Sequence, residues 1–407
     1  MLTESEPISW VTFQSGKKLK ERLLFIDAMR AVAILMMLQG HFVDSLLHHS
    51  YKDTANPIFN AWAFFRGITP SLFFTVSGLV FVYLLLKKDA PFLKHPRVIK
   101  GARRVLHLLF WGYFLRLFIF GVFQGEINPS FFAIDVLHCI GIALLSILVL
   151  FGLHKFWDKI PFAIYLIVGS LAIFLLYPTY NSQDYSALPT FFASYFTKEF
   201  GSVFTPFPWV GYALFGGFVG AVFHANPKFT KSYWAVAFFV GLGLVLHEYS
   251  SYGLMKMYQF TAWENFKSIA YNNFIFIRLG HVLVMIGGFI LLEKLALLGK
   301  ANNTFLRIGQ ETLMIYKVHF IVLYGTWFGI GLVRLYGGKL APIPVVIGAV
   351  LFVLSFILLI HFQAKWGAYL DIQKRKVKAF YQRNLPVIQH AIYDFWGSFK
   401  GVNFKKK

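Results

Sequence analysis

One apolar stretch, Phe25–Leu47, carries four ionisable side chains, and this combination constrains the whole chain. A helix needs about 20 apolar residues to cross the hydrocarbon core of a bilayer, and this stretch has that length. A charged residue at membrane depth costs about 2.5–3.5 kcal/mol on insertion scales, so several in one span require partners or a cavity away from lipid. The ionisable residues are Asp27, Arg30, His41 and Asp44.

These four side chains fall on one face of a helix. At about 100° per residue, the step from Arg30 to His41 returns to within about 20° of the same direction. The short steps from Asp27 to Arg30 and from His41 to Asp44 stay on that side as well. Arg30 and His41 are then about 16 Å apart along the axis. The spacing therefore predicts a polar stripe that faces the interior of a bundle, with one end toward each membrane face.

The composition is that of an integral membrane protein. Of the 407 residues, 57% are hydrophobic and 19% aromatic, which is unusual for a soluble domain. The net charge of +21 does not indicate nucleic acid, because the Lys and Arg residues form short clusters between apolar spans, as in cytoplasmic loops beside anionic lipid. The single cysteine, Cys139, excludes an intramolecular disulfide and a thiolate metal cluster. We see no cleavable signal peptide before the first span.

Hydropathy and loop charge predict an all-α, polytopic membrane bundle with about ten spans and both termini cytoplasmic. The predicted spans are 24–46, 59–86, 105–124, 131–152, 160–178, 206–224, 233–248, 275–298, 305–333 and 341–364. Most basic residues then lie inside, and the outside loops hold only Lys52, Lys198, Lys256, Lys267, Arg334 and Lys339. The chain divides into a cytoplasmic tail (1–22), a transmembrane domain (23–364) and a basic amphipathic tail (365–407) on the inner leaflet.

Polar side chains of other spans gather in the half of the bundle that this orientation places outside. Each has a structural alternative. A single interfacial His or Arg often snorkels, Asp135 and His138 can cap a helix start, and Ser77-Gly78 suits close helix packing. Their clustering nevertheless favours one polar site, formed by His41, Asp44, Arg66, Asp135, His138, Arg278 and His281, with His319 nearer mid-depth.

These residue types favour proton-transfer chemistry. A histidine has a pKa close to neutral pH, so it can act as a general base on a hydroxyl or amine, and a nearby carboxylate can orient it. Three histidines with a carboxylate would also suit zinc, but no HExxH spacing occurs and we predict no metal site. Neither a GxxxxGK[ST] phosphate loop nor a GxSxG elbow is present. A proton-coupled transporter or flippase using the same His, Asp and Arg groups is the alternative, although we find no paired repeats.

Several segments resemble one family. IDAMRAVAILMMLQGH resembles the first span of the transmembrane acyltransferases, including the acyltransferase-3 proteins, which share the spacing of Arg30 and His41. Four later segments are similar, in the same order, to spans of the heparan-α-glucosaminide N-acetyltransferase catalytic group and its bacterial relatives: SLFFTVSGLVF, DVLHCIGIALL, PFPWVGYALFGGFVGA and IGQETLMIYKVHF. The resemblance implies transfer of an acyl group, expected to be acetyl, from cytoplasmic acyl-CoA to a sugar or glycan hydroxyl or amine outside a bacterial cytoplasmic (inner) membrane.

The resemblance also implies roles for individual residues. Acetyl-CoA is the expected donor and a carbohydrate or glycan the expected acceptor; a homodimer is left open, as are direct transfer and an acyl-histidine intermediate. The expected catalytic residues are His41, Asp44 and His319, with His41 as the general base. The expected donor-binding residues are Arg30, Ser77, Gly78, Arg103, Arg104 and Tyr316, and the expected acceptor-binding residues are Arg66, Asp135, His138, Arg278 and His281.

Overall fold

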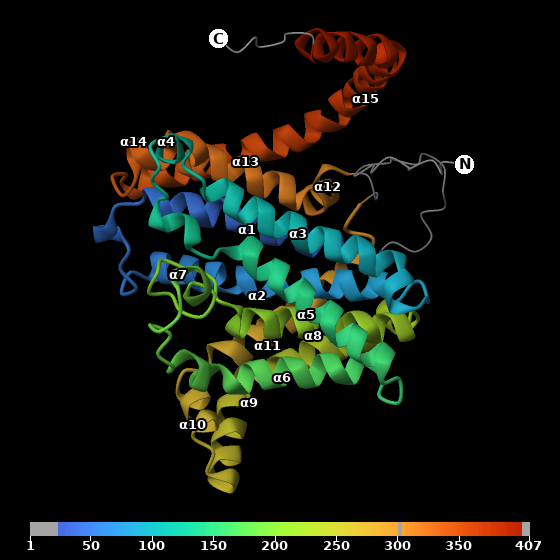
Figure 1. Ribbon diagram of the computed structural model, residues 1–407. Helices are drawn as coiled ribbons and strands as arrows, with labels where there is room; N and C mark the ends of the chain where they lie inside the picture. Colours follow the sequence, from blue (N-terminus) through green and yellow to red (C-terminus); the bar gives the residue numbers. More distant parts are fainter. Residues whose placement is uncertain (1–22, 300–302, 401–407) are drawn as a thin grey trace.

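The computed structural model describes residues 23–299 and 303–400 and confirms the all-α fold. Within these ranges no strand forms, and one isolated parallel bridge joins Leu47 and Leu340. Most long helices lie side by side, while α10 and the far part of α15 project from the bundle (Figure 1). The predicted N-terminal tail, 1–22, lies outside the described residues.

Fifteen α-helices are described, with short 3₁₀ turns between some of them. The α-helices are α1 (Leu24–Leu46), α2 (Pro57–Leu85), α3 (Pro96–Arg116), α4 (Ile119–Phe123), α5 (Val136–Phe156), α6 (Phe162–Asn181), α7 (Thr190–Ala193), α8 (Pro206–Ala225), α9 (Tyr233–Thr261), α10 (Glu264–Tyr271), α11 (Phe274–Lys294), α12 (Thr304–Gln310), α13 (Thr312–Tyr324), α14 (Leu332–Tyr336) and α15 (Pro342–Lys400). The 3₁₀ turns are η1 (His49–Tyr51), η2 (Phe92–Lys94), η3 (Pro129–Phe132), η4 (Phe229–Lys231) and η5 (Thr326–Phe328).

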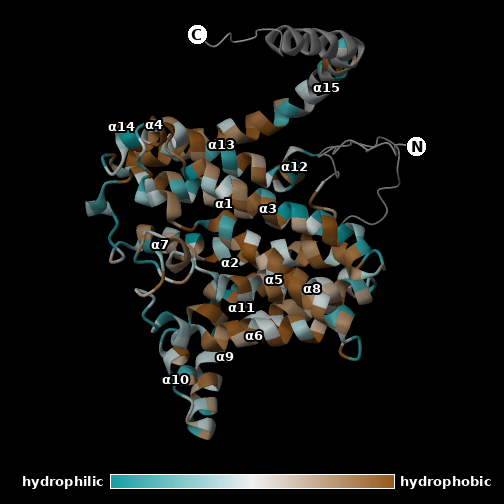
Figure 2. Ribbon diagram, in the orientation of Figure 1, coloured by the Kyte–Doolittle hydropathy of each residue, from teal (hydrophilic) through white to brown (hydrophobic). Residues whose placement is uncertain are grey.

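Eight helices of the described chain are long and apolar enough to span a membrane, whereas the sequence predicted about ten spans. They are α1, α2, α5, α6, α8, α9, α11 and the Pro342–Gln363 part of α15. Figure 2 shows hydrophobic residues along the bodies of the bundled helices and hydrophilic residues toward the loops that join them. The integral membrane class is therefore supported by the lengths of the helices as well as by composition.

The two remaining predicted spans differ from single apolar helices for identifiable reasons. α3 begins at Pro96, earlier than predicted, so its first turns include the charged residues Arg97, Lys100, Arg103 and Arg104. The predicted span 305–333 is broken instead into α12, α13, η5 and α14. α13 ends at Tyr324, and the next residue, Gly325, has a left-handed backbone (φ 74°) that glycine adopts readily because it has no Cβ. Both segments still belong to the bundle, since α3 packs on α5, and α12 and α13 pack on α1.

The last predicted span and the described part of the predicted basic tail, 365–400, form one continuous helix, α15. It packs on α1 and α12 and then leaves the bundle (Figure 1). The predicted amphipathic face of 365–407 depends mainly on side chains outside the described set, so that part of the expectation stays a prediction.

α1 is enclosed by protein, as its polar stripe requires. It packs against α2, α11, α12, α13 and α15. One face of α1 is apolar: Ile34, Leu38 and Phe42, spaced four residues apart, are buried in a core shared with α13 and α15. The ionisable stripe of α1 is therefore left to face the space between α1, α2 and α13.

Glycines bring α2 and α8 into backbone contact. A Cβ added to Gly78 would overlap the carbonyl oxygen of Ala213, and one added to Gly216 would overlap that of Thr75. Close approach of this kind is typical of small residues in membrane bundles, where packing replaces the hydrophobic effect between helices. Gly78 is therefore a packing residue at the junction of α2 and α8.

Replacing Gly78 with Ala is expected to lower the free energy of unfolding by about 1–3 kcal/mol, because a backbone overlap cannot be relieved by a change of rotamer. Gly288→Ala in α11 is the matched control, since a Cβ there meets no heavy atom within 4 Å. Thermal unfolding of the two purified variants in the same detergent measures the difference. Equal transition temperatures for G78A and the unaltered protein would contradict this account of the α2–α8 contact.

Candidate active site

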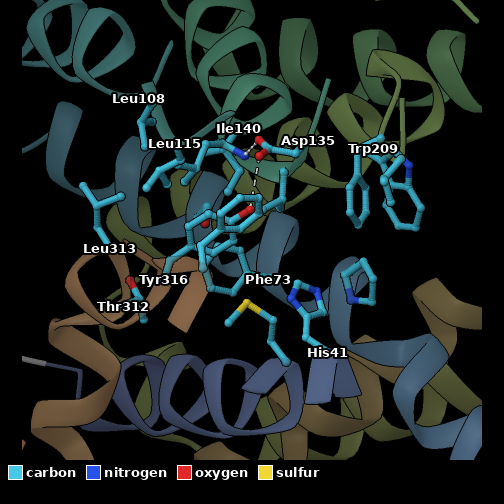
Figure 3. A pocket seen from close by; sticks show the side chains of 18 of the residues that line it. His41, Phe73, Leu108, Leu115, Asp135, Ile140, Trp209, Thr312, Leu313 and Tyr316 are labelled. Carbon is cyan, nitrogen blue, oxygen red and sulfur yellow. Dashed lines mark hydrogen bonds between the residues drawn. The ribbon is translucent and has the colours of Figure 1, made fainter. Parts of the chain in front are cut away.

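A cavity of about 1100 Å³ lies inside the bundle. Its walls come mainly from α1, α2, α3, α13 and the start of α5, with Trp209 of α8 and Arg278 of α11. Figure 3 shows this space, with His41 on one wall and Asp135 and Tyr316 on another. The polar stripe of α1 opens into it, because Arg30, His41 and Asp44 all line the cavity.

The cavity has two chemically different ends. Arg97, Lys100 and Arg104 of α3 line what we term the basic end. His41, Asp44, Arg66 and Arg278 line what we term the His41 end. Apolar side chains that also line the cavity include Phe73, Leu108, Leu115, Ile140 and Leu313, labelled in Figure 3. One space therefore combines a basic mouth, apolar walls and an imidazole.

Arg30 is held by polar partners within the bundle. Its Nη2 donates a hydrogen bond to the Thr312 hydroxyl at 3.0 Å, and its Nη1 lies 4.0 Å from a carboxylate oxygen of Asp27. The neighbouring Asp27 thus reduces the cost of burying the guanidinium, as a paired charge is less costly than an isolated one. Arg30 keeps a place on the cavity wall while these contacts fix its orientation.

His41 contacts another imidazole. Its Nδ1 lies 3.1 Å from Nε2 of His319, which is fully buried on α13. The sequence suggested that Asp44 or another carboxylate orients His41, but Asp44 forms an ion pair with Arg66. No carboxylate within the described residues is hydrogen-bonded to His41. The structure therefore pairs Asp44 with Arg66 and not with His41, although both side chains line the same end of the cavity, and the catalytic role of Asp44 stays a prediction.

Asp135 is the most heavily bonded acid in the cavity wall. Its carboxylate accepts the Leu137 backbone N–H at 3.0 Å, and it lies 3.0 Å from Nδ1 of His138. Arg116 Nε and the Tyr316 hydroxyl donate to its other oxygen, both at 3.4 Å. Asp135 and His138 form a capping box at the start of α5, which is the structural alternative to the expected acceptor-binding role.

The structure separates the predicted site residues into two groups. Those that line the cavity are Arg30, His41, Asp44, Arg66, Ser77, Arg104, Asp135, Arg278 and Tyr316. Those that do not are Gly78, Arg103, His138, His281 and His319. Gly78 packs on α8, Arg103 is exposed, and the His138 ring lies against Gly112. His281 contacts His247, with 3.0 Å between their Nε2 and Nδ1 atoms, and His319 reaches the site only through His41.

Sequence reasoning missed several lining residues, and for α3 the signal was available. Arg97, Lys100 and Arg104 are three, then four residues apart, which places them on one face of a helix. Arg103 neighbours Lys100 but lies about 100° round the helix from Arg104. Arg116, Trp209 and Tyr324 also line the cavity. No spacing pattern within their own spans identifies these three as lining residues. Their partners come from other segments, such as Ser130 for Arg116.

The arrangement suits binding of an anionic, elongated ligand and proton transfer near its far end. Guanidinium groups recognise phosphate through paired N–H donors, as the basic end could supply. An imidazole on the cavity wall can take and return a proton. Among the described residues, no three His, Cys, Asp or Glu side chains gather closely enough to hold a metal ion.

Comparison with protein families matches residues 22–244 to the catalytic part of heparan-α-glucosaminide N-acetyltransferase. A search of curated proteins finds no match. The matched region contains Arg30, His41, the basic end and Asp135, and it stops before Arg278 and α13. Because it covers more than half of the chain, the chain belongs to the heparan-α-glucosaminide N-acetyltransferase catalytic family, which implies acyltransferase activity.

Proposed function

We propose that this protein moves an acyl group, specifically acetyl, from cytoplasmic acyl-CoA to a hydroxyl or amine of a sugar or glycan on the outer side of the membrane. The observation that carries the proposal is that the basic end and His41 line one cavity. Family membership supports the acyltransferase chemistry. The donor, the acceptor and the sidedness are proposed from the charges and the placement of the residues.

The basic end is the proposed site for the phosphates of CoA. The excess of Lys and Arg in the loops on this side favours a cytoplasmic location for it, with both termini on that side of a bacterial cytoplasmic membrane. Arg30 supplies a further guanidinium on the wall. The apolar walls would accept the pantetheine arm and the acyl group, so that the thioester lies toward His41.

His41 is the proposed general base. The acceptor oxygen or nitrogen attacks the thioester carbonyl while His41 takes the acceptor's proton, and the carbon–sulfur bond breaks. The same proton then passes from His41 to the departing thiolate, which leaves as free CoA. An acyl group carried briefly on His41 would use the same atoms in two steps. Arg66, Arg278 and Asp135, which line the cavity, are the proposed contacts for the acceptor.

The proposal is tested with the full chain reconstituted in nanodiscs. Radiolabelled acetyl-CoA and a panel of amino sugars and glycan fragments should give acceptor-dependent transfer of label and release of CoA. Reconstitution into vesicles tests the transporter alternative, which predicts sugar flux without any acyl donor. Donor-independent flux, together with no transfer to any acceptor and no binding of acetyl-CoA, would overturn the proposal.

A further inference from the structure

We propose that His319 is a positioning residue that fixes which nitrogen of His41 carries the proton, so that Nε2 of His41 is the atom that acts as base. The inference rests on the proposed function for its catalytic consequence, and on the contacts of the two rings for its structural part. In this arrangement a second, neutral imidazole takes the place of the carboxylate that usually orients a catalytic histidine.

The contact between the two rings requires one donor and one acceptor. His41 Nδ1 and His319 Nε2 are 3.1 Å apart, a hydrogen-bond distance. A neutral imidazole carries a proton on one nitrogen and a lone pair on the other. Two lone pairs at this distance repel, and two N–H groups clash. One of the two nitrogens must therefore carry the proton, and the other must accept it. The direction of the bond therefore determines the tautomer of both rings.

The surroundings of His319 favour one direction. The ring is fully buried on α13, beside Tyr316 and Phe320. Its Nδ1 makes no hydrogen bond of standard geometry. The carbonyls of Ile315 and Tyr316 lie one turn earlier in α13, and side chains of a helix lean back toward that turn. Carbonyl oxygens only accept, so a proton on Nδ1 is favoured there over a lone pair. Nε2 of His319 then has the lone pair and accepts from Nδ1–H of His41.

This assignment leaves His41 with its lone pair on Nε2. His41 lines the cavity, and no protein group within the described residues is hydrogen-bonded to its Nε2. The other charged or titratable groups around His41 are Arg66, Asp135 and Tyr324, and Asp44 of the same helix is committed to Arg66. His319 is therefore the group placed to hold the ring while Nε2 faces the reactants.

Two substitutions separate this role from simple packing. His319→Leu introduces an apolar side chain of similar size and removes the acceptor. His319→Gln introduces an amide oxygen that can accept from the Nδ1–H of His41. We expect H319L to lower kcat about 100-fold with KM for acetyl-CoA changed less than about twofold, and H319Q to recover most of that loss. Equal activity of H319L and the unaltered protein, or H319Q no better than H319L, would overturn the assignment.

A spectroscopic test does not depend on turnover. Nitrogen NMR of the ¹⁵N-histidine-labelled protein in nanodiscs, with His41→Asn used for assignment, should show His41 protonated on Nδ1 and unprotonated on Nε2. Protonation of His41 on Nε2 in the resting state would contradict the proposal even if acyl transfer is established. Absence of acyl transfer in the unaltered protein would instead defeat the proposed function, while the NMR result still decides the tautomer. Should H319L fail to fold, H319Q and the NMR experiment still test the proposal.

Discussion

His41→Asn is expected to lower kcat for acyl transfer by about 10²–10⁴-fold, the range contributed by a positioned general base. Asn is smaller than imidazole but still polar, so it can keep a hydrogen bond toward His319 while losing the basic nitrogen. Donor binding should change little, because the proposed phosphate contacts lie at the basic end, on α3. The measurement is acetyl transfer under saturating acetyl-CoA, with donor affinity taken from the thermal shift that the donor produces.

His281→Asn is the matched control for this experiment. His281 also contacts a second histidine, His247, at 3.0 Å, but it does not line the cavity. H281N should therefore keep most of the activity, while any general cost of disturbing a histidine pair inside the bundle appears in both variants. A fully active H41N would remove the proposed base. Equal losses in H41N and H281N would indicate a structural rather than a catalytic effect.

The helical repeat of the first span made the relation of Arg30 to His41 predictable. Both residues were placed on one face by spacing alone, and both line the cavity. The same reasoning could not select the partners of these residues, because partners come from other helices. Asp44 lies one turn from His41 and would suit it by spacing, yet Arg66 of α2 takes its carboxylate. His319, far along the chain, takes the position beside His41 instead.

The number of spans shows a similar limit. Hydropathy located eight helices that the described chain confirms as long enough and apolar enough to span a membrane. Hydropathy alone does not detect the charged first turns of α3, which the spacing of Arg97, Lys100 and Arg104 indicates, nor the breaks of the predicted span 305–333 at Glu311 and Gly325. Those two departures coincide with the cavity: α3 supplies the basic end, and α13 supplies Tyr316 and Tyr324 to its wall. Irregular or charged segments inside a bundle are tolerated where they line a cavity.

Arg104→Glu is expected to weaken binding of acyl-CoA by about 30-fold or more. Losing one charge-assisted hydrogen bond to phosphate costs about 2 kcal/mol, and each 1.4 kcal/mol corresponds to about tenfold in affinity. The introduced carboxylate adds repulsion between like charges. The measurement is the dissociation constant of a non-hydrolysable acetyl-CoA analogue at low and high salt. The difference between R104E and the unaltered protein should shrink as salt rises, because exposed charges are screened.

Arg103→Glu is the control, since it makes the same change of charge on the adjacent residue of the same helix. Arg103 and Arg104 are both exposed, but only Arg104 lines the cavity. If the phosphates bind inside the basic end, R103E should weaken donor binding less than about threefold. A change of that size is consistent with the altered long-range electrostatic field alone. If the donor is instead attracted only by the net charge of the cytoplasmic loops, the two variants should weaken it equally. Equal weakening would show that the donor does not bind in the cavity, and Arg30 and His41 would then not act on the same bound donor.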